Sequence, residues 1–172
     1  ESGTSVKTLR NYYVYADDID SDGVIELPHL ISMQPLPGTK TGDDQYIIRW
    51  FAITADGGEV DKRYTYHNFV GGWYLQLPSD WASRITVDQF QNEHVFYIWD
   101  ESYRSAELLF KLHVFTGGNR DEEAVKNGRF AVYRAEGVAY SAILEEAAKE
   151  YGITEDDDAT AVRNGGFGST TK

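Results

Sequence analysis

Five acidic residues crowd the ten positions from Asp17 to Glu26, and four of them have the spacing of a calcium-binding loop. From Asp18 the chain reads D-x-D-x-D-G-x-x-E, so alternate side chains can point into one concavity, and the glycine allows a sharp turn. Calcium takes six to eight oxygen ligands at about 2.3–2.6 Å, which carboxylates, a backbone carbonyl and water can supply. The sequence therefore predicts a calcium site with the ligands Asp18, Asp20, Asp22, Val24 (through its carbonyl) and Glu26.

The residues after the loop narrow its class. An EF-hand or dockerin-type loop needs an acid at position 12 and flanking helices, but position 12 is His29, preceded by Pro28. The flanks also favour strands. We therefore expect a calcium hairpin between two strands, in which the ion has a structural role because no base or nucleophile neighbours it. The alternative is an exposed acidic turn that holds no ion.

The elements that must position this loop are mostly strands. Glu136-Gly137 and Asp56-Gly57-Gly58 mark turns between strands, and apolar residues alternate with polar ones along most of the chain. Pro28 restricts its strand to a sheet edge or a bulge. Strands are expected at 11–16, 24–33, 46–54, 59–69, 73–78, 83–90, 94–99 and 106–115, with two more around 136–137.

Helical signals come later in the chain. Asn119 resembles an N-cap with Glu122 three residues on, which predicts a helix over 120–127. Apolar residues at helical spacing predict a second helix over 140–151, and a further turn is expected after Thr154. The fold class is therefore α+β, a mostly antiparallel β-sheet with two or three short helices mainly towards the C-terminus. The expected organisation is a β-hairpin region with the calcium loop at 1–70 and an α+β domain at 71–172, which could pack as one unit.

Composition limits the possible partners. The chain has 172 residues with 16 Lys and Arg against 28 Asp and Glu, a net charge of −12, which argues against nucleic acid or an anionic membrane. The absence of Cys excludes disulfides, zinc fingers and iron–sulfur clusters. No apolar run reaches the ~18 residues of a membrane span, and there is no signal peptide. A start without Met indicates a processed protein or a fragment.

The similarity to known sequences extends past the loop. The segments DIDSDGVIELP, RWFAIT, YTYHNFVGGWYLQLPSDWASRITV, FYIW and LLFKLHVFTGGNR, which span 18–120, resemble the C-terminal part of exported proteins of Gram-positive bacteria. Those proteins are often lipid-anchored and carry integrin-like, FG-GAP-type repeats, in which the same acidic motif is the calcium loop. The resemblance, which extends over about 18–144, implies an extracellular or cell-envelope location and a calcium loop, with the 1–70 region as a remnant of a propeller blade. It implies no activity, and the single repeat departs from the several that a propeller needs.

Other residues could do chemistry, but their spacing is less specific. His29, His67, His94 and His113 are scattered, and Asp100-Glu101 could be half of a carboxylate pair for glycoside hydrolysis or a solvated turn. The aromatic residues could form the core or an exposed platform for sugars. They are Trp50, Tyr64, Tyr66, Trp73, Tyr74, Trp81 and Trp99.

These patterns lead to a non-enzymatic cell-surface module, stabilised by calcium, that contacts a protein or a glycan. A carbohydrate-binding module with exposed Trp and Tyr is the alternative. A hydrolase is the third hypothesis, and it would require two acids, or an acid and a His, in a pocket away from the loop.

Overall fold

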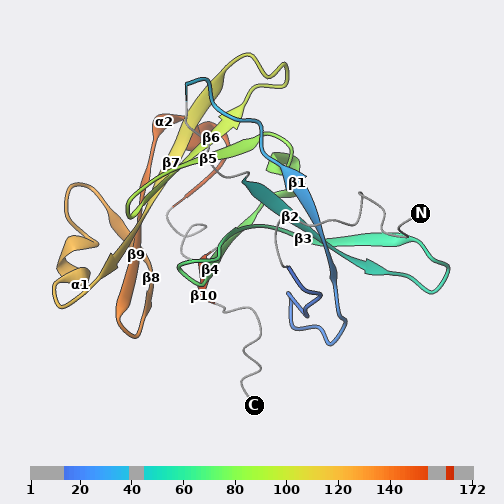
Figure 1. The fold of residues 1–172 in the computed structure, drawn as a ribbon. Coiled ribbons are helices and arrows are strands. Elements are labelled where there is room, and N and C mark those ends of the chain that lie inside the picture. The colour runs from blue at the N-terminus through green and yellow to red at the C-terminus, as the bar shows by residue number, and fades with distance from the viewer. Residues whose placement is uncertain (1–13, 39–44, 155–161, 165–172) are drawn as a thin grey trace, which may run out of the picture.

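Two antiparallel sheets, each of five strands, form the protein in the computed structural model, which describes residues 14–38, 45–154 and 162–164. In both sheets the neighbours along the chain mostly pair as hairpins (Figure 1). The first sheet has the order β1 (Leu27–Ser32), β2 (Tyr46–Ile53), β3 (Glu59–Asn68), β4 (Trp73–Leu77) and β10 (Val162–Asn164). The second has the order β5 (Ile85–Phe90), β6 (Glu93–Trp99), β7 (Ala106–Thr116), β9 (Val138–Leu144) and β8 (Phe130–Ala135).

The mostly antiparallel β-structure with a few short helices is as predicted, but the helices are differently placed. They are η2 (Ser79–Trp81), α1 (Arg120–Glu123) and α2 (Glu146–Glu150), so the first lies mid-chain and the expected concentration towards the C-terminus is not found. Within the described ranges, no helix has the length and apolar character needed to span a membrane.

The predicted helix over 140–151 is wrong in its first half. Residues 138–144 form β9, in which Tyr140 pairs with Val114 and Ala142 pairs with Leu112 of β7. The apolar residues fit both a helical and an alternating pattern, and pairing with a long neighbouring strand decides between them. Only Glu146–Glu150 is helical.

Two other predicted boundaries also change. Helix α1 ends at Glu123, where the Arg129 guanidinium donates two hydrogen bonds to the carbonyl oxygen, and Asn119 makes no side-chain cap. Of the strand expected at 11–16, residues 11–13 lie outside the described residues, and 14–16 are not in a strand. The turn expected after Thr154 also lies outside the described residues.

The main core fills the space between the two sheets. Trp73, Leu75 and Leu77 share one buried face of β4, as their period of two predicts, and they meet Phe96 and Phe110 of the second sheet. All four tryptophans of the chain are at most 6 % exposed, so the core interpretation holds for them and they form no exposed platform.

The first sheet crosses the expected boundary at residue 70, because β4 pairs with β3. Strand β1 lies at the sheet edge, where Pro28 is expected. The acidic loop therefore leads directly into an edge strand, because β1 begins at Leu27, the residue after Glu26.

Candidate metal centre

The acidic loop is closed at its base by a pair of backbone hydrogen bonds. The N–H of Asp17 donates to the carbonyl of Glu26 at 3.1 Å, and the N–H of Glu26 donates back at 2.9 Å. Between these residues the chain turns through two left-handed positions, Ser21 (φ 61°) and Gly23 (φ 86°). Glycine favours that conformation, which is why the motif has it at this position.

Backbone N–H groups of the loop hold its aspartates in place. The two carboxylate oxygens of Asp18 accept hydrogen bonds from the N–H groups of Asp22 and Gly23, each at 3.0 Å. Oδ1 of Asp22 accepts from the N–H of Val24 at 2.8 Å. One carboxylate oxygen from each of Asp18, Asp20 and Asp22 lies within 4.8 Å of the others. The structure thus gathers three of the predicted ligands.

Glu26, the fourth predicted carboxylate ligand, lies outside this group of three, at the base of the loop, and is fully buried. Its Oε2 accepts a hydrogen bond from the N–H of Ile19 at 3.1 Å, so the carboxylate lies against the loop backbone. Its Oε1 is buried and has no hydrogen-bond partner within the described part of the chain, and Oδ1 of Asp20 is in the same situation. Burial raises the pKa of Glu26, and the charges of Asp20 and Asp22 raise it further. These two unpartnered oxygens need a positive charge or a donor.

Lys62 of β3 brings a positive charge to the loop. Its Nζ lies 2.5 Å from Oδ2 of Asp22. The pKa of Asp22 is lowered, chiefly by this hydrogen bond, and the pKa of Lys62 is raised, first by Asp22 and then by Asp20 and Glu26. Sequence reasoning missed Lys62, because nothing in the local motif indicates a residue forty positions away.

A small apolar cluster anchors the loop to the outer side of the first sheet. Ile19 of the loop and Val14 before it are buried against Ile48 and Trp50 of β2. The packing of Ile19 therefore attaches the loop to β2 and fixes the position of the loop backbone that carries the aspartates.

Three other residues that the sequence analysis singled out, Val24, Asp17 and His29, lie at or near the surface. The N–H of Val24 binds Asp22, and its side chain is 45 % exposed; its carbonyl as a ligand stays a prediction. Asp17 is exposed and lies outside the three-aspartate group, since its Oδ1 accepts the N–H of Asp18. His29 is exposed on β1.

Asp100 organises a turn. Its carboxylate accepts the N–H and hydroxyl of Ser102, the N–H of Arg104, and the N–H and hydroxyl of Ser105. These five hydrogen bonds lower the pKa of Asp100 well below its usual range. A carboxylate committed to five local donors is a poor general acid.

Three of the four histidines are buried in aromatic surroundings. The ring of His67 stacks on that of Tyr74, with the ring centroids 5.0 Å apart, and its Nε2 is hydrogen-bonded to the hydroxyl of Thr65. The ring of His94 lies edge-to-face with that of Trp73, with the centroids 4.9 Å apart. Burial lowers the pKa of His67 to about 3, and burial together with the charge of His113 lowers that of His94 to about 4. Both rings are neutral at physiological pH. The rings of His67 and His94 are therefore part of the packing.

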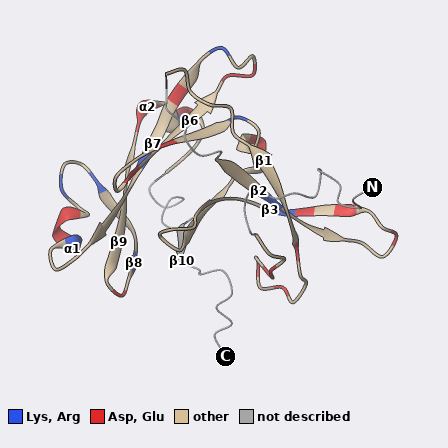
Figure 2. Ribbon diagram, viewed as in Figure 1, with Lys and Arg blue, Asp and Glu red and all other residues tan. Residues whose placement is uncertain are grey.

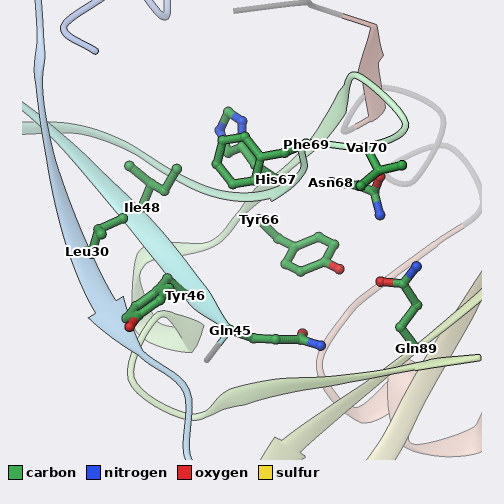
Figure 3. A pocket seen from close by; sticks show the side chains of 10 residues that line it. All are labelled: Leu30, Gln45, Tyr46, Ile48, Tyr66, His67, Asn68, Phe69, Val70 and Gln89. Carbon is green, nitrogen blue, oxygen red and sulfur yellow. The ribbon is translucent and has the colours of Figure 1, made fainter. Parts of the chain in front are cut away.

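A pocket of about 190 Å³ lies where β1, β2 and β3 approach Gln89 of β5. Figure 3 shows Gln45, Tyr66 and Gln89 extending towards the same space. The volume is below the ~300 Å³ at which ligand pockets usually begin. None of the described lining residues carries an acid or a base other than the neutral His67; they are Leu30, Gln45, Tyr46, Ile48, Tyr66, His67, Asn68, Phe69, Val70 and Gln89.

Comparisons of the chain with protein-family models, with curated proteins and with solved structures gave no match.

Proposed function

We propose that the loop from Asp18 to Glu26 binds one calcium ion and that the ion holds the loop on the edge of the first sheet. The observation that carries the proposal is Glu26, which is fully buried with Oε1 unpartnered among the described residues and which interacts electrostatically with two of the three gathered aspartates, Asp20 and Asp22. An unpaired buried carboxylate is costly, and a divalent cation would remove that cost.

The donor set fits calcium better than other common metals. All the proposed ligands are oxygens: the carboxylates of Asp18, Asp20, Asp22 and Glu26 and the carbonyl of Val24. Hard oxygen donors suit calcium and magnesium, whereas zinc and copper favour the imidazole and thiolate ligands that this loop lacks. Calcium also accepts the irregular shell that a short loop supplies.

Thermal unfolding with and without calcium tests the site. Calcium should raise the melting temperature, and Asp20→Ala should abolish the shift, because Oδ1 of Asp20 is one of the two unpartnered oxygens. At free calcium 100-fold above Kd the linkage is worth ~2.7 kcal/mol. An unchanged melting temperature at millimolar calcium would contradict the proposal.

On this proposal the chain is a non-catalytic module of the bacterial cell surface, in which the ion has a structural role. The wider protein would be exported and lipid-anchored, and the module would contact a protein or a glycan; the resemblance to exported Gram-positive proteins supports this part. A millimolar calcium supply outside the cell suits a weak loop site. Fractionation of the native protein, with release by a lipase, would test the location.

A second candidate function is binding of a small uncharged ligand, such as one sugar residue, in the pocket beside Gln89. The lining favours an uncharged ligand, because its described residues have amide, aromatic and apolar side chains and include no Asp, Glu, Lys or Arg, although the chain as a whole has a net charge of −12. Titration with neutral monosaccharides, followed by amide chemical shifts of Gln45 and Gln89, tests this candidate. Shifts that spread evenly over the protein would reject it.

A further inference from the structure

Lys62 reaches the acidic loop from a different part of the chain. It lies in β3, and its ammonium group is 2.5 Å from Oδ2 of Asp22. Figure 2 shows the acidic and basic residues of the β2–β3 hairpin close together, and Arg49 there pairs with Glu59 and Asp61. Lys62 instead pairs with a residue of the loop, forty positions earlier.

Both carboxylate oxygens of Asp22, a proposed ligand of the ion, already have a hydrogen-bond donor in the structure. Oδ1 of Asp22 accepts the N–H of Val24, and Oδ2 binds Lys62. The charge of Lys62 also acts on Asp20 and Glu26, the residues with the unpartnered oxygens. An ammonium group at hydrogen-bond distance from Oδ2 and a calcium ion on the same oxygen would repel each other strongly.

We propose that Lys62 is a tethered competitor of calcium, which neutralises the loop when calcium is scarce and leaves Asp22 when the ion binds. This inference rests on the calcium site proposed above. It assigns Lys62 a regulatory role: the built-in cation weakens calcium binding and moves the response of the loop to higher calcium concentration. It also links the ion to the β2–β3 hairpin, since binding frees a side chain of β3.

Calorimetric titration of the full chain with calcium chloride tests the competition. Lys62→Met keeps the length and apolar stem of the side chain but removes the charge, and it should tighten calcium binding by about 3-fold to 10-fold. Lys62→Arg keeps the charge and should stay within about two-fold of the wild type. Lys149→Met is the matched control, because it removes one exposed positive charge on α2, where Lys149 pairs with Glu146.

The outcomes separate this inference from the calcium site itself. If the wild type binds calcium and Lys62→Met binds equally or more weakly, Lys62 positions Asp22 and the competition is rejected, while the calcium site stands. Equal tightening in Lys149→Met would reduce the effect to net charge and also reject it. If no variant binds calcium, the proposed site fails, and the competition fails with it.

A second measurement uses the wild-type protein and does not depend on a variant that folds. Acylation of lysines, read by mass spectrometry, reports how freely each amine reacts. Calcium should increase the labelling of Lys62 several-fold, because the released ammonium loses its pairing with Asp22, and should leave Lys149 unchanged. Labelling of Lys62 that stays constant while calcium binds would overturn the proposal.

Discussion

The backbone N–H of Ile19 donates a 3.1 Å hydrogen bond to Oε2 of Glu26, and it holds a fully buried carboxylate at the base of the acidic loop. The other oxygen, Oε1, has no partner in the part of the chain that the structure describes. Burial and the neighbouring charges of Asp20 and Asp22 raise the pKa of Glu26. The buried carboxylate of Glu26 should therefore lower the free energy of unfolding without a cation and raise it when a cation is bound.

Glu26→Gln should have opposite effects with and without calcium. In a chelator the variant should be as stable as the wild type or more stable, because a neutral amide replaces a buried charge and can still accept the N–H of Ile19. In calcium it should bind about ten-fold more weakly or worse, since the loop loses one anionic ligand. Urea unfolding in each condition measures both effects.

Asp17→Asn is the control for Glu26→Gln. It also removes one acid of the loop, but Asp17 lies outside the group of gathered aspartates, and its Oδ1 accepts the N–H of the adjacent Asp18. It should leave the calcium-induced stabilisation within about two-fold in affinity. A variant Glu26→Gln that lost stability equally with and without calcium would show that Glu26 has only a packing role.

Sequence patterns predict most of the strands because alternation is a local signal. The hairpin of β2 and β3 is found where the apolar runs and Asp56-Gly57-Gly58 place it. Residues 140–144 are the instructive failure. Their spacing suits a helix, but Tyr140 lies in the core between the sheets and pairs with Val114, and no local pattern contains that contact.

In the acidic loop, too, the local features follow from the sequence motif and the long-range contacts do not. The positions of Asp18, Asp20 and Asp22 follow from the motif, since the turn at Gly23 and the local N–H groups bring them together. The contact with Lys62 depends on where β3 lies, and the burial of Glu26 depends on how the loop packs on β2. Long-range contacts of this kind need the fold.

Thr65→Val tests a hydrogen-bonded chain inside the first sheet. The Thr65 hydroxyl accepts the indole N–H of Trp50 at 2.7 Å and lies 2.7 Å from Nε2 of His67, to which it can donate its own proton. Valine is nearly isosteric, but it leaves the buried indole N–H of Trp50 without its acceptor. We expect a loss of about 1–3 kcal/mol in the free energy of unfolding, measured in urea.

Ser141→Ala is the matched comparison for Thr65→Val. Ser141 is also fully buried, but its hydroxyl has no hydrogen-bond partner among the described residues. Its removal should be neutral or stabilising, because it relieves an unsatisfied polar group. Equal losses in the two variants would show that the hydroxyl of Thr65 does not act through Trp50.

Gly71→Ala should disrupt the tight turn between β3 and β4. A Cβ at this position would lie 2.8 Å from Oδ1 of Asn68 and 2.8 Å from the indole ring of Trp73, which is buried and cannot move aside. The expected loss is about 1–3 kcal/mol. At Gly118 the same substitution meets open space, and φ is outside the left-handed region, so Gly118→Ala should be neutral or slightly stabilising. Equal stabilities in thermal unfolding would contradict the predicted clash.

The buried histidines should make the protein lose stability in mild acid. Burial lowers the pKa of His67 to about 3 and that of His94 to about 4, whereas a histidine in the unfolded chain titrates near 6.5. Both rings therefore stay neutral in the folded protein while the unfolded chain takes up protons. Their contribution is complete above pH 6.5 and is lost as the pH falls towards 4, by about 1–2 kcal/mol per histidine between pH 6.5 and pH 5. The raised pKa of Glu26 acts in the opposite direction, because the folded protein then takes up a proton before the unfolded chain does, so it offsets part of the loss at the lower end of this window.

Urea unfolding between pH 7.5 and pH 5, with and without His94→Gln, measures this dependence. The variant lacks one of the buried histidines, so its stability should fall less steeply than that of the wild type, even if the lost contact with Tyr66 lowers the whole curve. Ring proton chemical shifts of His94 in the native protein give an independent check, because a neutral ring must keep a constant shift over the same range. A shift of His94 that moved with a midpoint above pH 6 would mean that the folded protein protonates this ring, and the contribution of His94 to the predicted slope would then vanish.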